Sequence, residues 1–427
     1  MAGSRGTGNP GGDGRLRLEV RAQLGAATIR DLLFLAQRIP YPPTKGEKIR
    51  AWPILQHLAA SFRVHLGCLV DDPEDEPHIG TVAALCATSH FARLDRRWAK
   101  LKSLTGLLTG EPLSVTFYRD RALTAWVART LREIEPAAVF VFSSNMAPYV
   151  LGRTGEAVTL CDLTDVDSEK WRAYAEQGGA MQLVHRREWR RVAALEGRIA
   201  RDMDWSTFVS EGEADLFRAQ WPAQAGKVRV VPNGVNFAYF DPAISQNAPY
   251  PTDQLNFVFT GTMDYPPNVD AVRWFAADIL PIIRGHQPAR FHIVGANPAA
   301  EVRALAGDGV FVTGRVPDVR PYVAHATAAV APMRIARGIQ NKVLEAMAMA
   351  RPVVVTPDAL EGIDATPGTD VLLGADADAF AAHCLEAAGP GAAAIGASAR
   401  RLIERSYSWA GRLQGFDALL DGTAAPR

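Results

Sequence analysis

The chain has 427 residues, of which 48% are hydrophobic, and its 46 Lys and Arg residues balance 46 Asp and Glu residues. This composition is typical of a globular protein with two domains, and the zero net charge removes the electrostatic argument for a nucleic-acid-binding protein. The four cysteines form no CxxC pair, which argues against a zinc centre or a disulfide framework, and no apolar run approaches the ~20 residues of a transmembrane helix.

The first part of the chain predicts an α/β domain. Residues 1–28 are a Gly-rich tail without an apolar core, so we expect disorder there and no secretory signal. Apolar runs predict strands at 30–37, 62–70, 137–142, 157–163 and 205–210, with helices at 49–61 and 168–201. Strand–helix–strand units of this kind build parallel sheets, and we expect one domain over residues 29–240.

A second alternating series begins near residue 255. It predicts strands at 256–263, 289–296, 309–316, 328–333 and 352–357, with a helix at 271–284. We therefore expect two doubly wound α/β domains facing a cleft, the second over 241–405. The last segment, 406–427, predicts a helix that returns to the first domain.

A short stretch of the second domain predicts an anion-binding helix start. Residues 338–341 precede an expected helix over 342–350, whose N-terminus carries partial positive charge. Arg334, Arg337 and Lys342 add full charges at that end. Glu345 lies one turn later, where its carboxylate could accept hydrogen bonds from a ribose diol. The pattern fits a nucleoside diphosphate, although a solvated surface helix with a weak Lys–Glu contact has the same spacing.

Several motifs resemble one enzyme family. KVLEAMAMARPVVVTPDALEGI and VVPNGVNFAYFDP resemble the donor-domain signature of family 4 glycosyltransferases of the GT-B fold. RIPYPPTKGEKIR, DVDSEKWRAYA, FTGTMDYPPNVDAVRWF and VTGRVPDVRPYVAHA resemble, more narrowly, the sugar transferases found with exosortase (PEP-CTERM) exopolysaccharide systems. The resemblance runs from about residue 30 to 420.

This resemblance implies a fold and an activity. We expect two Rossmann-like domains, the first binding the acceptor and the second holding a UDP- or GDP-linked sugar. Transfer would go to an exopolysaccharide or lipid-linked glycan, with retention, without a metal and without a further cofactor. We expect a cytoplasmic protein, with peripheral contact to the inner face of the cell membrane as a further option. The alternatives are a nucleotide-sugar epimerase of the GT-B fold and a non-catalytic two-lobed sugar-binding protein.

The resemblance also assigns donor residues. Glu345 matches the second glutamate of the family motif, which holds the nucleotide ribose, whereas Arg337 stands where the family has its first glutamate. This departure leaves the sugar contacts open. The expected donor set is Gly261, Thr262, Arg315, Arg334, Arg337, Gly338, Gln340, Asn341, Lys342 and Glu345.

The first domain offers candidates at the ends of its strands. Lys45 and Gly46 lie in a basic loop where the family has a glycine facing the donor phosphates, and Lys48 could add charge; a solvated loop is the alternative. Asp165 and Asp167 form a DxD motif that could contact sugar hydroxyls, cap the next helix or, less in keeping with its position, bind a metal. Asn145 or Tyr149, in 143–150, could replace a sugar-contacting histidine of the family.

Residues 90–104 predict a basic amphipathic helix. Phe91, Leu94, Trp98 and Leu101 would share one face, and five Lys and Arg residues lie around it. Such a helix can rest on an anionic membrane surface, or it can pack its apolar stripe on the core.

Overall fold

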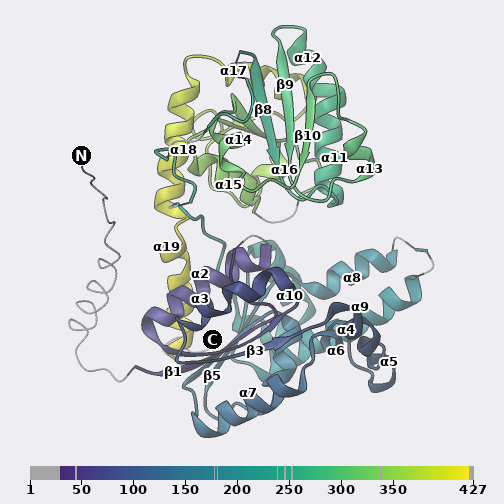
Figure 1. Cartoon of the computed structure of the whole chain (residues 1–427), viewed down its shortest axis with the longest axis vertical. Coiled ribbons are helices and arrows are strands. Elements are labelled where there is room, and N and C mark those ends of the chain that lie inside the picture. Colours follow the sequence, from purple (N-terminus) through teal and green to yellow (C-terminus); the bar gives the residue numbers. More distant parts are fainter. Residues whose placement is uncertain are drawn as a thin grey trace, which may run out of the picture.

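The structure, a computed structural model, describes residues 29–43, 46–176, 178–179, 181–237, 239–244, 247–251, 253–336 and 339–422. It contains a seven-stranded sheet with the strand order β3-β2-β1-β4-β5-β6-β7 and a six-stranded sheet with the order β10-β9-β8-β11-β12-β13. The strands pair in parallel, and helices cover both sheets (Figure 1). The expectation of two doubly wound α/β domains is confirmed.

The first domain contains the larger sheet. Its strands are β1 (Asp31–Ala36), β2 (Arg63–Val70), β3 (Thr88–Arg93), β4 (Ala138–Phe142), β5 (Val158–Thr164), β6 (Trp205–Phe208) and β7 (Val228–Val230). The helices are α2 (Gly46–Ser61), η1 (Pro73–His78), α3 (Ile79–Ala83), α4 (Arg96–Ser103), α5 (Gly106–Thr109), α6 (Leu113–Tyr118), α7 (Arg121–Glu133), η2 (Ser144–Tyr149), α8 (Asp167–Glu176), α9 (Gln182–Asp202), α10 (Glu211–Gln220) and η3 (Pro222–Lys227). The central strands β1 and β4 are almost entirely buried, as expected for strands covered on both faces.

The second domain repeats this architecture. Its strands are β8 (Leu255–Thr260), β9 (Ala289–Val294), β10 (Val310–Gly314), β11 (Ala328–Ala331), β12 (Val353–Val355) and β13 (Leu372–Leu373). The helices are α11 (Pro266–Trp274), the π-helical turn η4 (Phe275–Ile279), α12 (Leu280–Arg284), α13 (Ala300–Arg303), α14 (Arg320–Ala324), α15 (Asn341–Ala348), α16 (Pro357–Leu360), α17 (Ala377–Glu386) and α18 (Ala392–Ser406). We keep 29–240 and 241–405 as proposed domain limits, with residues 231–254 between the two sheets.

The last helix, α19 (Trp409–Leu420), packs on the first domain, as predicted (Figure 1). The Phe416 ring meets the Phe140 ring edge-on, with centroids 5.1 Å apart. Asp417 Oδ1 lies 2.7 Å from His57 Nε2 on α2. The chain therefore crosses between the domains twice.

Two local expectations were wrong. The segment 88–93 is the edge strand β3 and not the start of a helix; its side chains are only half-buried, so it lacks the apolar run of an inner strand. The expected helix over 168–201 is two helices, α8 and α9, because Gly178 and Gly179 have φ angles of 77° and 91°. The predicted tail, 1–28, lies outside the described residues. Within the described residues, no helix is long and apolar enough to cross a membrane.

Candidate functional site

The site candidates gather at the carboxyl ends of the parallel strands, where ligands bind in open α/β sheets. In the second domain, the loops after β8 and β9 pack closely together. A Cβ atom on Gly295 would lie 1.6 Å from the carbonyl oxygen of Gly261, so only glycine fits at residue 295. Gly261 N–H donates to Val294 (3.1 Å), and Gly295 N–H donates to Gly314 (3.1 Å). The predicted donor residue Gly261 thus belongs to a tightly packed pair of loops.

Helix α15 carries the predicted anion-binding end. Its Val343, Leu344 and Met347 side chains are buried, which fixes the helix on the sheet. Gln340 is the N-cap residue, and Asn341 is the first helical residue, as the sequence predicted to within one position. On the other face of the helix, the side chains of Lys342 and Glu345 are half-buried. The helix therefore presents a cation and a carboxylate one turn apart.

The ammonium group of Lys342 is held from two sides. Its Nζ donates to Asn268 Oδ1 at 2.9 Å and lies 4.8 Å from the centroid of the Phe259 ring. Burial lowers the pKa of Lys342 to about 8, and the nearby Glu345 partly offsets this shift. A cation in such a low-dielectric position gains more from a phosphate oxygen than an exposed lysine would.

Asn268 was not predicted from the sequence. It lies in the first turn of α11, where its Nδ2 donates to the carbonyl oxygen of Thr262 at 2.9 Å while its Oδ1 accepts from Lys342. A single amide thus joins the loop after β8 to the start of α15. A polar residue in the first turn of a helix at the carboxyl edge of the sheet was the signal that could have identified it.

Glu345 carries the other half of the pair. Burial raises the pKa of Glu345 to about 7, and the charge of Lys342 acts in the opposite direction. No side chain in the described ranges donates a hydrogen bond to this carboxylate, and Lys342 is the neighbour whose charge acts on it. A carboxylate in this position has free lone pairs for a ligand hydroxyl.

The other predicted donor residues are more dispersed. Arg334 forms a two-pronged ion pair with Asp270 on α11, at 3.0 and 2.5 Å, and its guanidinium stacks 5.3 Å from the Trp274 ring centroid. Arg315 is exposed just after β10, and Thr262 is exposed just after β8. Arg337 and Gly338 lie outside the described residues, so their roles in binding the donor stay predictions.

In the first domain, the carboxyl ends of β4 and β5 have unusual backbone geometry. Ser143 and Thr164 have φ angles of 82° and 67°, a region that costs a β-branched residue about 1–3 kcal/mol. Strain of this kind collects at functional sites, and Asp165 follows Thr164 directly. The structure therefore gives the DxD segment a fixed and strained support.

The two aspartates of this segment have different surroundings. Asp165 is accessible to solvent but recessed among acidic neighbours; partial desolvation, then Glu213 and Asp167, raise its pKa to about 6. Asp167 is the first residue of α8 and accepts a hydrogen bond from Ser144 Oγ at 2.8 Å. Burial raises the pKa of Asp167. Of the two, Asp165 is the more exposed to an incoming hydroxyl group.

Two predicted roles in the first domain are wrong. Lys48 is buried, with Nζ 2.6 Å from Asp75 Oδ2, so it adds no charge to the loop before α2. The hydroxyl of Tyr149 accepts from Asp120 N–H and donates to the carbonyl oxygen of Tyr118, both at 2.7 Å, so it holds a loop in place. Gly46 is the first residue of α2, and Lys45 lies outside the described residues.

A buried network below the site was also missed. Arg50 on α2 binds both carboxylate oxygens of Asp162 on β5 at 2.7 and 2.9 Å, and Thr207 donates to the same carboxylate at 2.8 Å. Arg50 also donates to Asn233 at 3.0 Å, in the segment that leaves the first domain. The network ties that segment to α2 and β5. In the sequence, the polar residue Asn233 within the motif VVPNGV was the feature that could have indicated this network.

Metal-ligand clusters are absent from the described parts of the chain: no group of three His, Cys, Asp or Glu side chains is placed to hold an ion.

Comparisons with known proteins agree with this architecture. Residues 254–389 match the family model described as "Glycosyl transferases group 1". No curated protein matches the chain in sequence. Among solved structures, sucrose-phosphate synthase from Thermosynechococcus elongatus is 17% identical, with a TM-score of 0.62 over 92% of this chain and 99% of that chain.

Two further solved structures are similar over the same extent. HepE of Anabaena, in complex with UDP-glucose, is 13% identical, with a TM-score of 0.61 over 92% of this chain and 100% of that chain. A glycosyltransferase from Rickettsia africae is 13% identical, with a TM-score of 0.63 over 92% and 98%. These likenesses confirm the GT-B fold that the sequence predicted, and the narrower family 4 and exosortase-associated assignments stay predictions.

Proposed function

We propose that this chain of GT-B fold is a nucleotide-sugar-dependent glycosyltransferase of the family 4 and exosortase-associated type. The second domain binds the donor, and the first domain binds an exopolysaccharide or lipid-linked glycan acceptor in the cytoplasm. The match of residues 254–389 to glycosyl transferases group 1 supports this proposal. The UDP-glucose in the similar HepE structure supports a UDP-linked sugar as the first donor to test.

The observation that carries the proposal is the Lys342–Glu345 pair at the start of α15. Lys342 and the helix N-terminus supply positive charge for a diphosphate, and the unbonded carboxylate of Glu345 accepts from ribose hydroxyls. Because both groups are half-buried and fixed on one helix, they select for a ligand that carries phosphate and diol at matching positions.

The chemistry follows from these placements. The bond between the anomeric carbon and the diphosphate oxygen breaks, and the electron pair leaves with the nucleoside diphosphate. Lys342 and the α15 N–H groups stabilise that leaving charge. The acceptor hydroxyl forms the new bond on the same face and passes its proton to the departing phosphate oxygen, so retention needs no protein base. Asp165 orients a sugar hydroxyl, and Asp167 supports the helix beside it.

Binding measurements test this proposal. Thermal shift with UDP, GDP, UDP-glucose and free glucose should show stabilisation by a nucleotide, since a ligand that binds only the folded state raises apparent stability. Lys342→Ala and Glu345→Gln should weaken that shift. Glu301→Gln, at an exposed position on α13, is the matched control and should behave as the wild type.

Three outcomes would contradict the proposal. A response to free sugar without any response to nucleotides would indicate a sugar-binding protein. Conversion of the sugar of UDP-glucose in the absence of an acceptor would indicate an epimerase. Unchanged nucleotide binding in both Lys342→Ala and Glu345→Gln would show that the nucleotide does not bind at the start of α15.

A further inference from the structure

Helices α4 and α5 expose their large apolar side chains. Of sixteen large apolar residues that are exposed in the described parts of the chain, five lie within eleven positions: Trp98 (66%), Leu101 (63%), Leu104 (53%), Leu107 (51%) and Leu108 (91%). A surface helix ordinarily turns such residues toward the core. Of the two options that the sequence left open, inward packing of the apolar stripe holds for Leu94, which is buried, but not for Trp98 and Leu101.

The buried side of the same segment consists of small residues. Ala99, Ser103 and Gly106 face the protein, and Thr116 Oγ1 on α6 donates to the Ser103 carbonyl oxygen at 2.9 Å. A Cβ atom on Gly106 would lie 3.0 Å from the carbonyl oxygen of Glu111. A larger residue at this position would require the neighbouring loop to shift, so the small residues allow this side of the segment to pack closely against α6.

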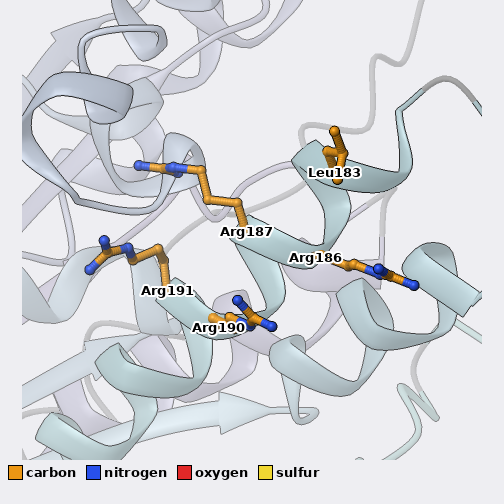
Figure 2. Close-up of a pocket in the computed structure, with 5 residues that line it drawn as sticks. All are labelled: Leu183, Arg186, Arg187, Arg190 and Arg191. Carbon is orange, nitrogen blue, oxygen red and sulfur yellow. The ribbon is translucent and has the colours of Figure 1, made fainter.

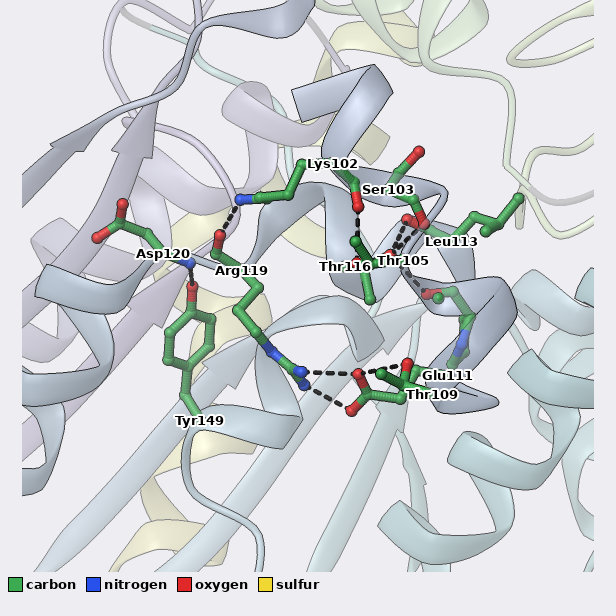
Figure 3. Close-up of polar contacts among 12 residues, drawn as sticks. Lys102, Ser103, Thr105, Thr109, Glu111, Leu113, Thr116, Arg119, Asp120 and Tyr149 are labelled. Carbon is green, nitrogen blue, oxygen red and sulfur yellow. Dashed lines mark hydrogen bonds and ion pairs between the residues drawn. The ribbon is translucent and has the colours of Figure 1, made fainter. Parts of the chain in front are cut away.

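The segment also rests on a firmly bonded support (Figure 3). Arg119 binds both carboxylate oxygens of Glu111 at 2.6 Å, and the Tyr149 hydroxyl holds the residues that follow α6. Lys102 donates to the carbonyl oxygen of Arg119. The apolar residues are thus presented on a rigid platform.

Helices α4 and α9 also carry many cations. Arg187 on α9 donates to the carbonyl oxygens of Gly106 and Glu111, so α9 lies against α5. Figure 2 shows Arg187 and Arg191 on one side of α9 and Arg186 and Arg190 on the other side, which borders α8. Residues 95–109 and 182–191, which we call the docking surface, together carry eight Lys and Arg residues against two carboxylates: Arg96, Arg97, Lys100, Lys102, Arg186, Arg187, Arg190 and Arg191.

Both carboxylates of the docking surface are already engaged. Asp95 caps α4 by accepting from the N–H groups of Arg97 and Trp98 at 2.8 and 2.9 Å. Glu188 is buried and accepts from Leu113 N–H at 2.8 Å and from Arg187 at 2.6 Å. The outer side is therefore apolar and strongly basic.

We propose that the docking surface binds the face of a bilayer that contains anionic phospholipids. Trp and Leu side chains flanked by Lys and Arg on one helix face suit the boundary between headgroups and acyl chains, where long cationic side chains reach phosphates. A second copy of this chain would bring like charge against like charge. In the chain, α4 follows β3, and α9 follows β5 and α8; Asp165 comes directly after β5. Docking would thus bring a membrane-held acceptor toward the edge of the sheet that carries Asp165.

Vesicle co-sedimentation of the full chain tests the proposal. The protein should bind vesicles of phosphatidylcholine with phosphatidylglycerol, bind phosphatidylcholine alone weakly, and dissociate as salt is raised. Arg97→Gln with Lys100→Gln should weaken binding about 25-fold, because each cation near an anionic surface contributes roughly fivefold. Leu101→Gln with Leu108→Gln should weaken it by on the order of tenfold.

Matched controls exclude a general loss of apolar surface. Leu216→Gln with Phe311→Gln, at exposed positions far from the docking surface in sequence, should bind vesicles as the wild type does. Brominated lipids should quench part of the tryptophan fluorescence of the wild type, and this quenching should be lost in Trp98→Phe. UDP-induced thermal shifts should be unchanged in all variants, so a failure of nucleotide binding and a failure of docking are separately visible.

Three results would overturn the proposal. The first is equal binding of neutral and anionic vesicles. The second is wild-type binding by both double variants. The third is a concentration-dependent dimer that Leu108→Gln abolishes in a protein that binds no vesicles, which would assign the surface to self-association.

Discussion

The ribose contact proposed for Glu345 can be measured by changing the protein and the ligand together. The perturbations are Glu345→Gln, which keeps the shape of the side chain and removes its charge, and 2′-deoxy-UDP in place of UDP. In the wild type, losing one hydrogen bond to a charged acceptor costs about 1.5–3 kcal/mol. Because the Glu345 side chain is half-buried and not fully enclosed, we expect the lower end, about tenfold in affinity.

In Glu345→Gln, removal of the 2′-hydroxyl should lower the affinity by a smaller factor, since a neutral amide oxygen is a weaker hydrogen-bond acceptor than a carboxylate. We expect UDP and 2′-deoxy-UDP to differ by only about two- to threefold, which gives a coupling energy of about 1 kcal/mol in the double-mutant cycle. Isothermal titration calorimetry of the four combinations measures it. If Glu345→Gln weakens both ligands equally, the carboxylate does not bind the ribose and the reasoning is wrong.

The same contact predicts a pH optimum for UDP binding. The pKa of Glu345 is raised to about 7 by burial, so the carboxylate gains its charge, and its strength as an acceptor, as the pH rises through that value. The pKa of Lys342 is lowered to about 8 by burial, so its positive charge is lost as the pH rises further. Affinity should therefore rise and then fall, with its maximum between these two values. A flat profile from pH 6 to 9, a range of about one unit either side of both pKa values, would contradict the assignment.

Three further changes have defined outcomes. Lys342→Met should weaken UDP by about 10- to 100-fold and leave uridine unchanged, because the lost interaction is a charge-assisted bond to phosphate. Glu196 is fully buried and accepts a hydrogen bond from Ser168 N–H, and burial raises its pKa to about 8. The free energy of unfolding should therefore fall by on the order of 3 kcal/mol as the pH rises from about 4.5 to 8. Glu196→Gln should remove this pH dependence. Gly295→Ala should cost about 2 kcal/mol or more in urea unfolding, because the new methyl group would collide with the Gly261 carbonyl oxygen.

These tests have their own controls. Uridine reports the nucleoside contacts alone in the Lys342→Met experiment. Gly212→Ala, on the exposed face of α10 where the nearest atom to a new methyl is 4.0 Å away, should stabilise slightly and so separates collision from the general effect of replacing glycine. Unchanged pH dependence in Glu196→Gln would show that another group titrates.

The sequence predicted the architecture because buried parallel strands are continuous apolar runs, as in β1 and β4. It predicted the start of α15 because Lys342 and Glu345 are neighbours on one helix, where spacing in the sequence determines spacing in space. It did not predict β3, because an edge strand with half-exposed side chains has no apolar run. The break between α8 and α9 depended on two glycines whose φ angles the sequence alone does not reveal.

Contacts between distant segments were beyond the sequence. Asn268 and Lys342 are 74 positions apart, and nothing local relates an amide on α11 to a lysine on α15. Lys48 looked like an available cation because its neighbours in the chain are basic, yet Asp75 neutralises it in the fold. The exposure of the apolar side chains of α4 and α5 likewise depends on the close packing of their small residues against α6, which the periodicity of the two helices does not reveal.

The return of α19 to the first domain has a consequence for biosynthesis. Leu413, Phe416, Leu419 and Leu420 belong to the core of the first domain, yet they are translated only after the whole second domain. Until then, the apolar surface that receives the Phe416 ring lacks its cover. The first domain therefore completes its folding only after the second has been synthesised. A chain stopped after residue 408 would keep Tyr407 in the core of the second domain but would leave the first domain without α19.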